Sequence, residues 1–212
     1  MELLLVRHAL PVRVVNSATG VVTKPVLSGL GWRQARAVAD WLAGTMPGGP
    51  PTEQVDAVYA STFSRARQTA EPLAERLDME VRIEQGLDEY DSDESEYIPV
   101  EELKATGDSR WRDLVSGDAI PDLEMFTVQV VAGVDRIIAA HPGQRVVAFC
   151  HGGTIAAYMA HLLGLDRVFF FEAAYTSVNR VLAASTGERS LVSLNETAHL
   201  RVAGLPTYLP GG

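Results

Sequence analysis

Three short apolar runs each lead into an arginine or a histidine, and these residue types can bind and transfer phosphate. The run LLLV stops at Arg7 and His8, the run VYAS leads into Arg65, and the run VVAFC stops at His151. Arginine offers a planar fork of charged donors that matches phosphate oxygens, and histidine serves as a neutral nucleophile or as a cationic donor. Four such side chains around one phosphoryl group would neutralise its oxygens while one of them attacks phosphorus.

The elements before these residues must end at one place if the residues are to act together. Residues 2–6, 55–61 and 145–150 have the composition of buried strands, and a helical pattern follows the second and the third. In open parallel sheets, ligands bind at the carboxyl ends of the strands. We therefore expect the arginines and histidines that follow the three strands to form a compact cationic pocket.

The stretch HGGT, which begins at His151, suits the same ligand. Gly152 and Gly153 permit a close approach of the backbone, and the helix expected after them presents free N–H groups at its N-terminus. We therefore expect Gly152 to bind substrate together with Arg7, Arg65 and His151. The residue types alone leave open which of the two histidines is the nucleophile.

The rest of the chain alternates strands and helices. Helices are expected over 28–45, 64–77, 123–141 and 151–164, a further strand over 80–87, and a β-hairpin over 177–195. This alternation predicts an α/β fold, a three-layer α/β/α sandwich with a mostly parallel central sheet and antiparallel strands late in the chain. The 212 residues predict a single domain over 1–212, with an inserted cap at roughly 90–121, where the pattern is weak.

Local signals mark the expected ends and breaks of these elements. Ser28 is the expected N-cap of the first helix, and Gly164 is the expected C-cap of the last. Pro72 lies inside the second helix and predicts a kink or a restart there. The stretch before Ser28, which contains Pro11 and Pro25, is expected to be irregular.

Charge limits the partners. The net charge of −9 argues against nucleic acid and anionic membrane surfaces, because both need a basic face on the protein. Eight acidic residues and no basic residue lie between Asp88 and Glu102, so the rest of the chain is nearly neutral and an anion site must be local. No run is long and apolar enough to cross a bilayer. We expect a cytoplasmic protein without nucleic-acid or membrane partners.

Two apolar features are expected in the core. Cys150 is the single cysteine, cannot form an internal disulfide, and is expected as a small buried side chain. The run VFFF, residues 168–171, is interpreted as core, and a contact in a homodimer is the alternative.

The motifs LLLVRHA, LSGLGWRQA, ASTFSRARQTA, LDE and VVAFCHGGT, in this order, resemble the histidine phosphatase superfamily, which includes the cofactor-dependent phosphoglycerate mutases. The resemblance implies the phosphoglycerate mutase-like α/β/α sandwich with a small inserted cap. It also implies that no metal and no cofactor is needed for phosphatase activity.

The resemblance also assigns roles to residues. His8 would be the nucleophile that forms a phosphohistidine. Arg7, Arg65 and His151 would hold the phosphoryl oxygens, with His151 as a charged donor. Glu89, the last residue of LDE, would protonate the leaving oxygen and later deprotonate water, a role that needs a raised carboxyl pKa.

Two stretches depart from the family pattern. Ala9 stands where family members usually have glycine, and YDSDESEY replaces the usual glycine-rich continuation after LDE. The second departure leaves Asp88, Asp91 and Glu94 open as alternative proton donors.

The expected function is hydrolysis of a small phosphate ester through a phosphohistidine on His8. One alternative is a mutase, which would need a priming bisphosphate and a pocket that excludes water. The other is a non-catalytic protein that binds phosphoesters through Arg7, Arg65 and His151 without a working acid.

Overall fold

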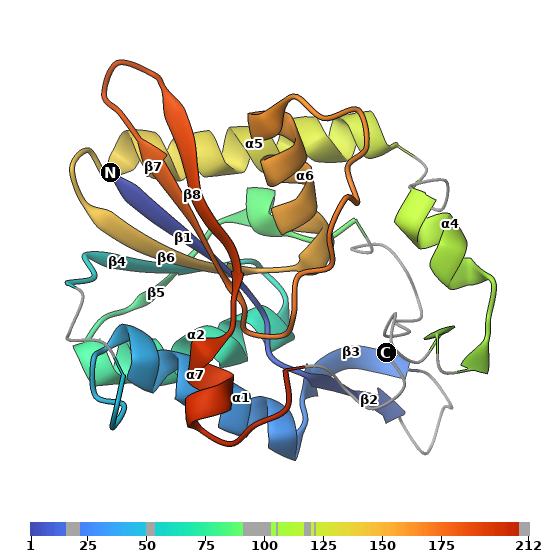
Figure 1. Cartoon of the computed structure of the whole chain (residues 1–212), viewed down its shortest axis with the longest axis horizontal. Helices are drawn as coiled ribbons and strands as arrows, with labels where there is room; N and C mark the ends of the chain where they lie inside the picture. Colours follow the sequence, from blue (N-terminus) through green and yellow to red (C-terminus); the bar gives the residue numbers. More distant parts are fainter. Residues whose placement is uncertain are drawn as a thin grey trace.

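A six-stranded mixed sheet forms the centre of the molecule (Figure 1). The computed structural model describes residues 1–15, 22–49, 54–90, 103–104, 106–116, 120 and 122–207. The strands lie side by side in the order β5 (Val81–Ile83), β4 (Ala57–Ala60), β6 (Arg145–Cys150), β1 (Glu2–Arg7), β7 (Val178–Ala183) and β8 (Arg189–Glu196). The first four run parallel, whereas β7 is antiparallel to β1 and β8 is antiparallel to β7. The predicted mostly parallel sheet and late hairpin are confirmed.

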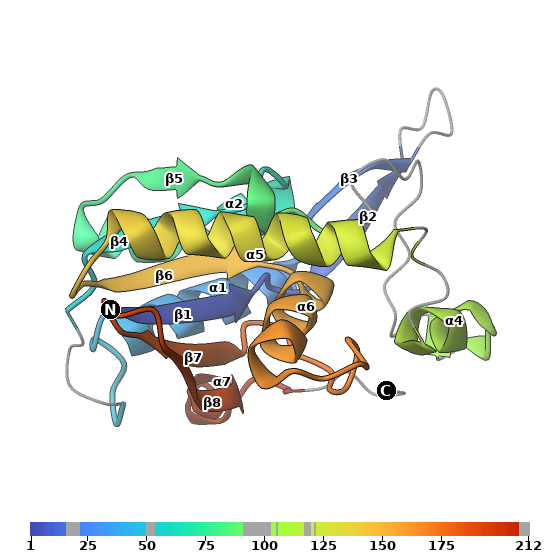
Figure 2. The ribbon, with the colours of Figure 1, turned by 90° about the horizontal axis from the view of Figure 1, so that it is seen from above.

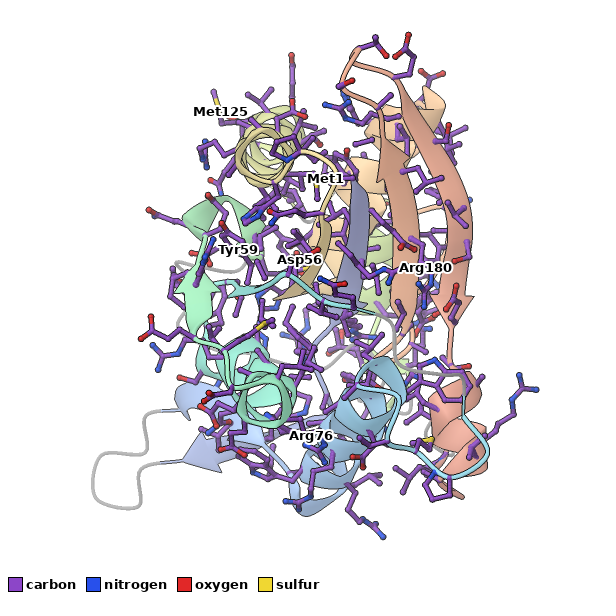
Figure 3. The ribbon with its side chains drawn as sticks, turned by 90° about the vertical axis from the view of Figure 1, so that its left-hand side faces the viewer. Met1, Asp56, Tyr59, Arg76, Met125 and Arg180 are labelled. Carbon is purple, nitrogen blue, oxygen red and sulfur yellow. The ribbon has the colours of Figure 1, made fainter. Side chains whose placement is uncertain are left out.

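Helices cover both faces of this sheet (Figures 2 and 3). One face carries α1 (Gly29–Leu42), α2 (Ser64–Leu77) and α7 (Ala198–Val202), and the other carries α5 (Leu123–Ala140) and α6 (Gly152–Leu163). Figure 3, which views the sheet from the end near Met1, shows α5 on one side of the strands and α1 and α2 on the other. The predicted α/β/α sandwich is confirmed. Among the residues that the structure describes, no helix is both long and apolar enough to span a membrane.

The alternation of side chains along β1 builds two cores. Leu3 and Leu5 pack in the cluster formed with α5 and α6, whereas Leu4 and Val6 pack in the cluster formed with α1 and α2. All four are fully buried. A strand covered on both faces has no polar side, which explains its continuous apolar run.

The two apolar features expected in the core lie on the α5 and α6 side. Cys150 is fully buried there, and burial raises the pKa of its thiol. Val168, Phe170 and Phe171 are half-buried and pack against the same cluster. The buried position of Cys150 is as predicted, whereas the half-buried run 168–171 does not decide between core and a homodimer contact, and both stay predictions.

The local signals for the helix ends are confirmed. The Ser28 side chain accepts a hydrogen bond from the backbone N–H of Gly31 at 2.9 Å, as an N-cap does. Gly164 has the left-handed conformation (φ 64°) of a C-cap. Helix α2 continues through Pro72 without a restart. Only one backbone donor is lost at a proline, and the buried side of α2 still packs against the sheet.

Two expectations about strands are wrong. The stretch before Ser28 is not irregular, because β2 (Pro11–Val15) and β3 (Val22–Leu27) form a separate two-stranded antiparallel sheet. Each strand of such a pair has an open edge, where the missing N–H of Pro11 or Pro25 is tolerated. The strand expected over 80–87 ends at Ile83, and a 3₁₀ turn, η1 (Gln85–Leu87), follows it.

Part of the expected cap at 90–121 lies within the described residues. Helix α4 (Arg110–Ser116) lies beyond the end of the sheet at which the parallel strands finish (Figure 2). Leu103 is buried, and Lys104 forms an ion pair with Glu172. The single domain and the extent of the cap stay predictions.

Candidate active site

The ends of β1, β6 and β4 bring the predicted residues together at one edge of the sheet. Arg7 pairs with Cys150 in the parallel ladder, and the N–H of His8 donates to the Cys150 carbonyl at 2.8 Å. Beside them, the N–H of Ser61 donates to the Phe149 carbonyl at 3.0 Å. The residues that follow the three strands therefore enter the same region, as the sequence predicts.

His8 is buried and held in one tautomer. Its Nδ1 lies 2.9 Å from the carbonyl oxygen of Ala9, and because a carbonyl only accepts, Nδ1 carries the proton. The lone pair is therefore on Nε2. Burial, followed by the charges of Arg65 and Arg7, holds the pKa of His8 well below its ordinary value of 6.5. The ring is neutral at neutral pH, as a nucleophile must be.

Helix α2 fixes the loop that carries His8. The N–H of Ala9 donates to Thr69 Oγ1 at 3.0 Å, and that hydroxyl donates to the Arg65 carbonyl one helical turn earlier. In the next residue, the N–H of Leu10 donates to Gln34 Oε1 at 3.0 Å from α1. The loop therefore has little freedom to move His8 away from Arg65.

His151 faces His8 across a ring-centroid distance of 5.1 Å. Its Nε2 lies 2.7 Å from Ser61 Oγ, and its Nδ1 accepts a hydrogen bond from Arg65 Nε at 3.2 Å. Burial, then the nearby positive charges of the two arginines Arg65 and Arg7, lowers the pKa of His151 well below 6.5. The free site therefore holds His151 neutral. A charged His151, which the resemblance implies, requires the negative charge of a bound phosphate to offset the two arginines.

Aromatic rings hold both arginines. The guanidinium carbon of Arg7 lies 4.0 Å from the centre of the Tyr175 ring, and that of Arg65 lies 4.5 Å from the centre of the Phe63 ring. Arg7 is 8% exposed and Arg65 is 2% exposed. Two buried guanidinium groups beside neutral histidines create a strong local preference for an anion in an otherwise acidic protein.

The carboxylate of Glu89 lies beside the N-terminus of α6. Its Oε2 accepts a hydrogen bond from the backbone N–H of Gly153 at 2.9 Å, and its side chain is largely buried. A Cβ atom on Gly153 would lie 2.3 Å from Glu89 Oε1, so any side chain there would displace the carboxylate. At Gly152, a Cβ atom would lie in ordinary contact with Arg7 at 3.5 Å. Gly152 thus lies beside Arg7, and its role in substrate binding stays a prediction.

The carboxylate of Asp88 has different hydrogen-bond partners from that of Glu89. One carboxylate oxygen accepts from the N–H of Thr62 at 2.7 Å, and the other accepts from the Thr62 hydroxyl at 2.8 Å. Both oxygens thus hold the loop after β4, which favours Glu89 over Asp88 as the proton donor. The other two alternatives, Asp91 and Glu94, lie outside the described residues.

The sequence analysis did not single out Ser61 or Tyr175. Ser61 is the first residue after β4, the same position that His8 and His151 have after their strands, so its place in ASTFSRARQTA was a usable signal. Tyr175 precedes β7 and contacts Arg7 from a distant part of the chain. No local pattern marks such a contact.

An alanine at position 153 tests the close approach of Glu89 to α6. Gly153→Ala is expected to lower kcat/KM for a phosphate ester by about 10- to 100-fold, because the new methyl group must displace the carboxylate. The control is Gly29→Ala, where a Cβ atom meets nothing within 4 Å. Steady-state kinetics of both variants provide the check. Equal activity of the two variants would show that the position of Glu89 does not matter.

His199, in α7, is buried and contacts Thr176, the residue after Tyr175. Its Nε2 lies 2.9 Å from the hydroxyl of Thr176, and burial lowers its pKa from 6.5 to about 4. As pH falls from 6.5 toward 4, the unfolded chain binds a proton at this residue and the folded chain does not, so folded stability is lost across that window.

A glutamine at position 199 removes this titration. Between pH 7 and pH 4.5, His199→Gln is expected to lose roughly 2 to 3 kcal/mol less unfolding free energy than the wild type. Urea unfolding at both pH values measures the difference, and His161→Gln, at an exposed position, is the control. Identical pH dependence of the unfolding free energy in the His199→Gln variant and the wild type would show that the titration of His199 does not cause the loss of stability.

Comparison with known proteins agrees with this geometry. The chain matches the family model "Histidine phosphatase superfamily (branch 1)" over residues 3–197. It is 26% identical over 140 residues to a protein of Bacillus subtilis (strain 168) named "Uncharacterized phosphatase PhoE", and that alignment covers 66% of each chain.

Solved structures share the fold. A phosphoserine phosphatase from Entamoeba histolytica, in complex with 3-phosphoglyceric acid, superposes with a TM-score of 0.70 at 23% identity, covering 94% of this chain and 98% of the other. A mycobacterial glucosyl-3-phosphoglycerate phosphatase superposes with a TM-score of 0.71 at 22% identity, covering 92% and 99%. The family match over nearly the whole chain, together with this shared fold, confirms the resemblance: the chain belongs to branch 1 of the histidine phosphatase superfamily.

Proposed function

We propose that this protein is a phosphomonoesterase that hydrolyses a small phosphate ester through a phosphohistidine on His8. The observation that carries the proposal is the state of His8, which is neutral, protonated on Nδ1 and surrounded by cationic groups. A neutral imidazole with a free Nε2 is a competent nucleophile toward phosphorus once the phosphate charge is offset. The named phosphatases among the relatives support hydrolysis rather than a mutase reaction.

In the first step, Nε2 of His8 forms a bond to phosphorus, and the bond from phosphorus to the ester oxygen breaks. Glu89 gives its proton to that oxygen, so the alcohol leaves neutral. Arg7, Arg65 and His151 hold the other phosphoryl oxygens as negative charge redistributes among them. A phosphorylated His8 and a product alcohol result.

In the second step, water attacks the phosphohistidine. Glu89, now a carboxylate, accepts a proton from the water as its oxygen bonds to phosphorus, and the bond from phosphorus to His8 Nε2 breaks. Inorganic phosphate leaves and His8 returns to its neutral form. The same carboxyl group is acid in one step and base in the other, which agrees with its single fixed position beside Gly153.

The test is hydrolysis of p-nitrophenyl phosphate by the wild type with EDTA present. We expect turnover without a metal ion, because two arginines and a protonatable histidine offset the phosphate charge. A parallel assay follows transfer of phosphate between hydroxyls of one acceptor with and without a bisphosphate primer. Bisphosphate-dependent transfer with little hydrolysis would favour a mutase, and phosphate binding without any turnover would favour a binding protein.

A further inference from the structure

Asn195 occupies a bulge in the late hairpin. Val178 pairs with Glu196 and Arg180 pairs with Ser193, so one residue of β7 lies opposite two residues of β8. Asn195 is one of those two, and its φ of 58° lies in the left-handed region, which asparagine tolerates better than most residues. Bulges re-aim side chains at functional sites. Strand pairing alone does not explain why Asn195 is held in this conformation, which directs attention to the contacts of its side chain.

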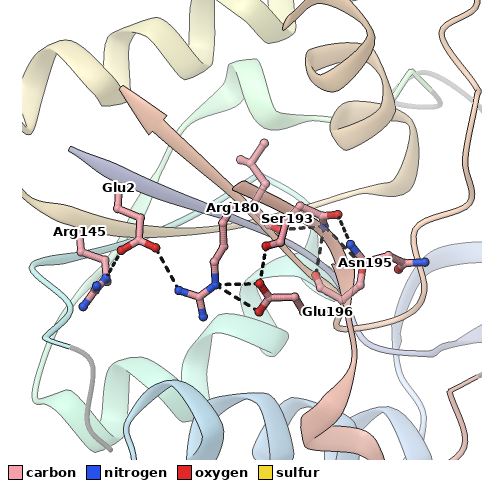
Figure 4. A network of polar contacts seen from close by, with 9 residues as sticks. Glu2, Arg145, Arg180, Ser193, Asn195 and Glu196 are labelled. Carbon is pink, nitrogen blue, oxygen red and sulfur yellow. Dashed lines mark hydrogen bonds and ion pairs between the residues drawn. The ribbon is translucent and has the colours of Figure 1, made fainter. Parts of the chain in front are cut away.

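Asn195, which Figure 4 shows within a network of polar contacts, holds the segment before β7 at two points through its side chain. Its Oδ1 accepts a hydrogen bond from the N–H of Ala174 at 2.8 Å, and its Nδ2 donates to the carbonyl of Glu172 at 3.1 Å. These two contacts lie on either side of Ala173. The amide group thus fixes the direction in which the Ala173 peptide points.

That segment holds Arg7 in turn. The carbonyl of Ala173 accepts a hydrogen bond from Arg7 Nη1 at 2.6 Å, and the Tyr175 ring lies against the guanidinium group at 4.0 Å. A displacement of the segment would therefore change both the direction and the contact surface of Arg7. Arginine binds phosphate through a planar fork, so its direction matters as much as its charge.

A second asparagine ties the bulge to β1. Asn179 Oδ1 accepts from the backbone N–H of Asn195 at 2.9 Å, and Asn179 Nδ2 donates to the carbonyl of Leu5 at 3.1 Å. The chain of contacts begins at Leu5 in β1 and returns to Arg7 at the end of the same strand. These contacts therefore hold the segment in place relative to β1, the strand that also leads into His8.

We propose that Asn195 is a positioning residue for Arg7 and so for the phosphoryl group. This inference rests on the proposed function in one respect, the binding of the phosphoryl oxygens by Arg7. Asn195 does not touch substrate itself, and its effect passes through the Ala173 carbonyl and the Tyr175 ring.

Substitutions at position 195 isolate the side chain from the backbone. Asn195→Gly keeps the left-handed conformation and removes both side-chain contacts, and it is expected to lower kcat/KM for p-nitrophenyl phosphate by about 10- to 100-fold. Asn195→Asp keeps the acceptor for Ala174 and loses the donor to Glu172, so its loss is expected to be smaller. The control is Ser193→Ala on the same strand, whose hydroxyl bonds to Glu196 and not to the segment.

A double-mutant cycle with Arg7→Ala separates positioning from general destabilisation. If Asn195 acts through Arg7, Asn195→Gly changes kcat/KM by less than about twofold when Arg7 is already absent. Losses that multiply in the double variant would overturn the proposal. If Arg7→Ala does not fold, as judged by thermal unfolding, Arg7→Lys provides the second background, because lysine lacks the planar fork.

Calorimetric binding of inorganic phosphate keeps this inference separable from the proposed function. Weaker phosphate binding by Asn195→Gly in a protein that shows no turnover would support the positioning role and contradict the phosphatase. Normal turnover and normal phosphate binding in Asn195→Gly would support the phosphatase and contradict the positioning role. A wild type that neither binds phosphate nor hydrolyses the ester would overturn both.

Discussion

Replacing His8 by alanine is expected to lower kcat for p-nitrophenyl phosphate by about 10⁴-fold or more, because the covalent route disappears with the nucleophile. The variant should still bind inorganic phosphate, since β1 and the Ala173 carbonyl hold Arg7, and Arg65 and His151 lie on other elements. Steady-state kinetics measure the first expectation and calorimetry the second. The control is His161→Ala at an exposed position of α6, which should retain activity.

Trapping of the phosphoenzyme decides which histidine is the nucleophile. Denaturation of the wild type during turnover should yield a phosphoryl group bound to protein, stable in base and labile in acid, as a phosphoramidate is. His8→Ala should yield none, whereas His151→Ala should still form it at a reduced rate. Loss of the phosphoenzyme in the His151→Ala variant and its persistence in His8→Ala would reverse the two roles.

Glu89→Gln is expected to make the rate depend strongly on the leaving group. An alkyl phosphate such as glycerol 2-phosphate has a basic leaving oxygen, so loss of the proton donor should slow its cleavage by about 10²- to 10⁴-fold. p-Nitrophenolate leaves without a proton, so the rate of the initial burst of p-nitrophenolate should change by less than about tenfold. The turnover that follows the burst should still fall, because water then lacks its base.

Asp88→Asn is the matched comparison for this prediction. Asp88 binds the loop after β4 through both of its oxygens, so its substitution should affect the two esters about equally. Stopped-flow and steady-state measurements on both variants give the required ratios. A leaving-group effect in Asp88→Asn and none in Glu89→Gln would move the acid role to Asp88.

Periodicity and chain order sufficed for most of the fold. The apolar run of β1, the Ser28 cap and the Gly164 cap are local features, and local features are visible in sequence. The pair β2 and β3 escaped prediction because Pro11 and Pro25 normally indicate a loop, and only the pairing of two edge strands makes them compatible with a sheet. The end of β5 at Ile83 depends on Glu84, whose carboxylate accepts from the N–H of Gly86 at 2.8 Å and stabilises a turn.

The sequence by itself predicted which residues meet at the site, because its arginines and histidines follow apolar strands whose ends a parallel sheet brings together. Glu89 was predicted through the LDE motif of the family resemblance. The tertiary structure decided the protonation, the hydrogen-bond partners and the orientation of those residues. The Nδ1 proton of His8, the division of tasks between Asp88 and Glu89, and the support of Arg7 by Tyr175 and Asn195 arise from contacts across long stretches of chain. Such contacts have no local signal, since burial and hydrogen-bond geometry exist only once the strands have paired.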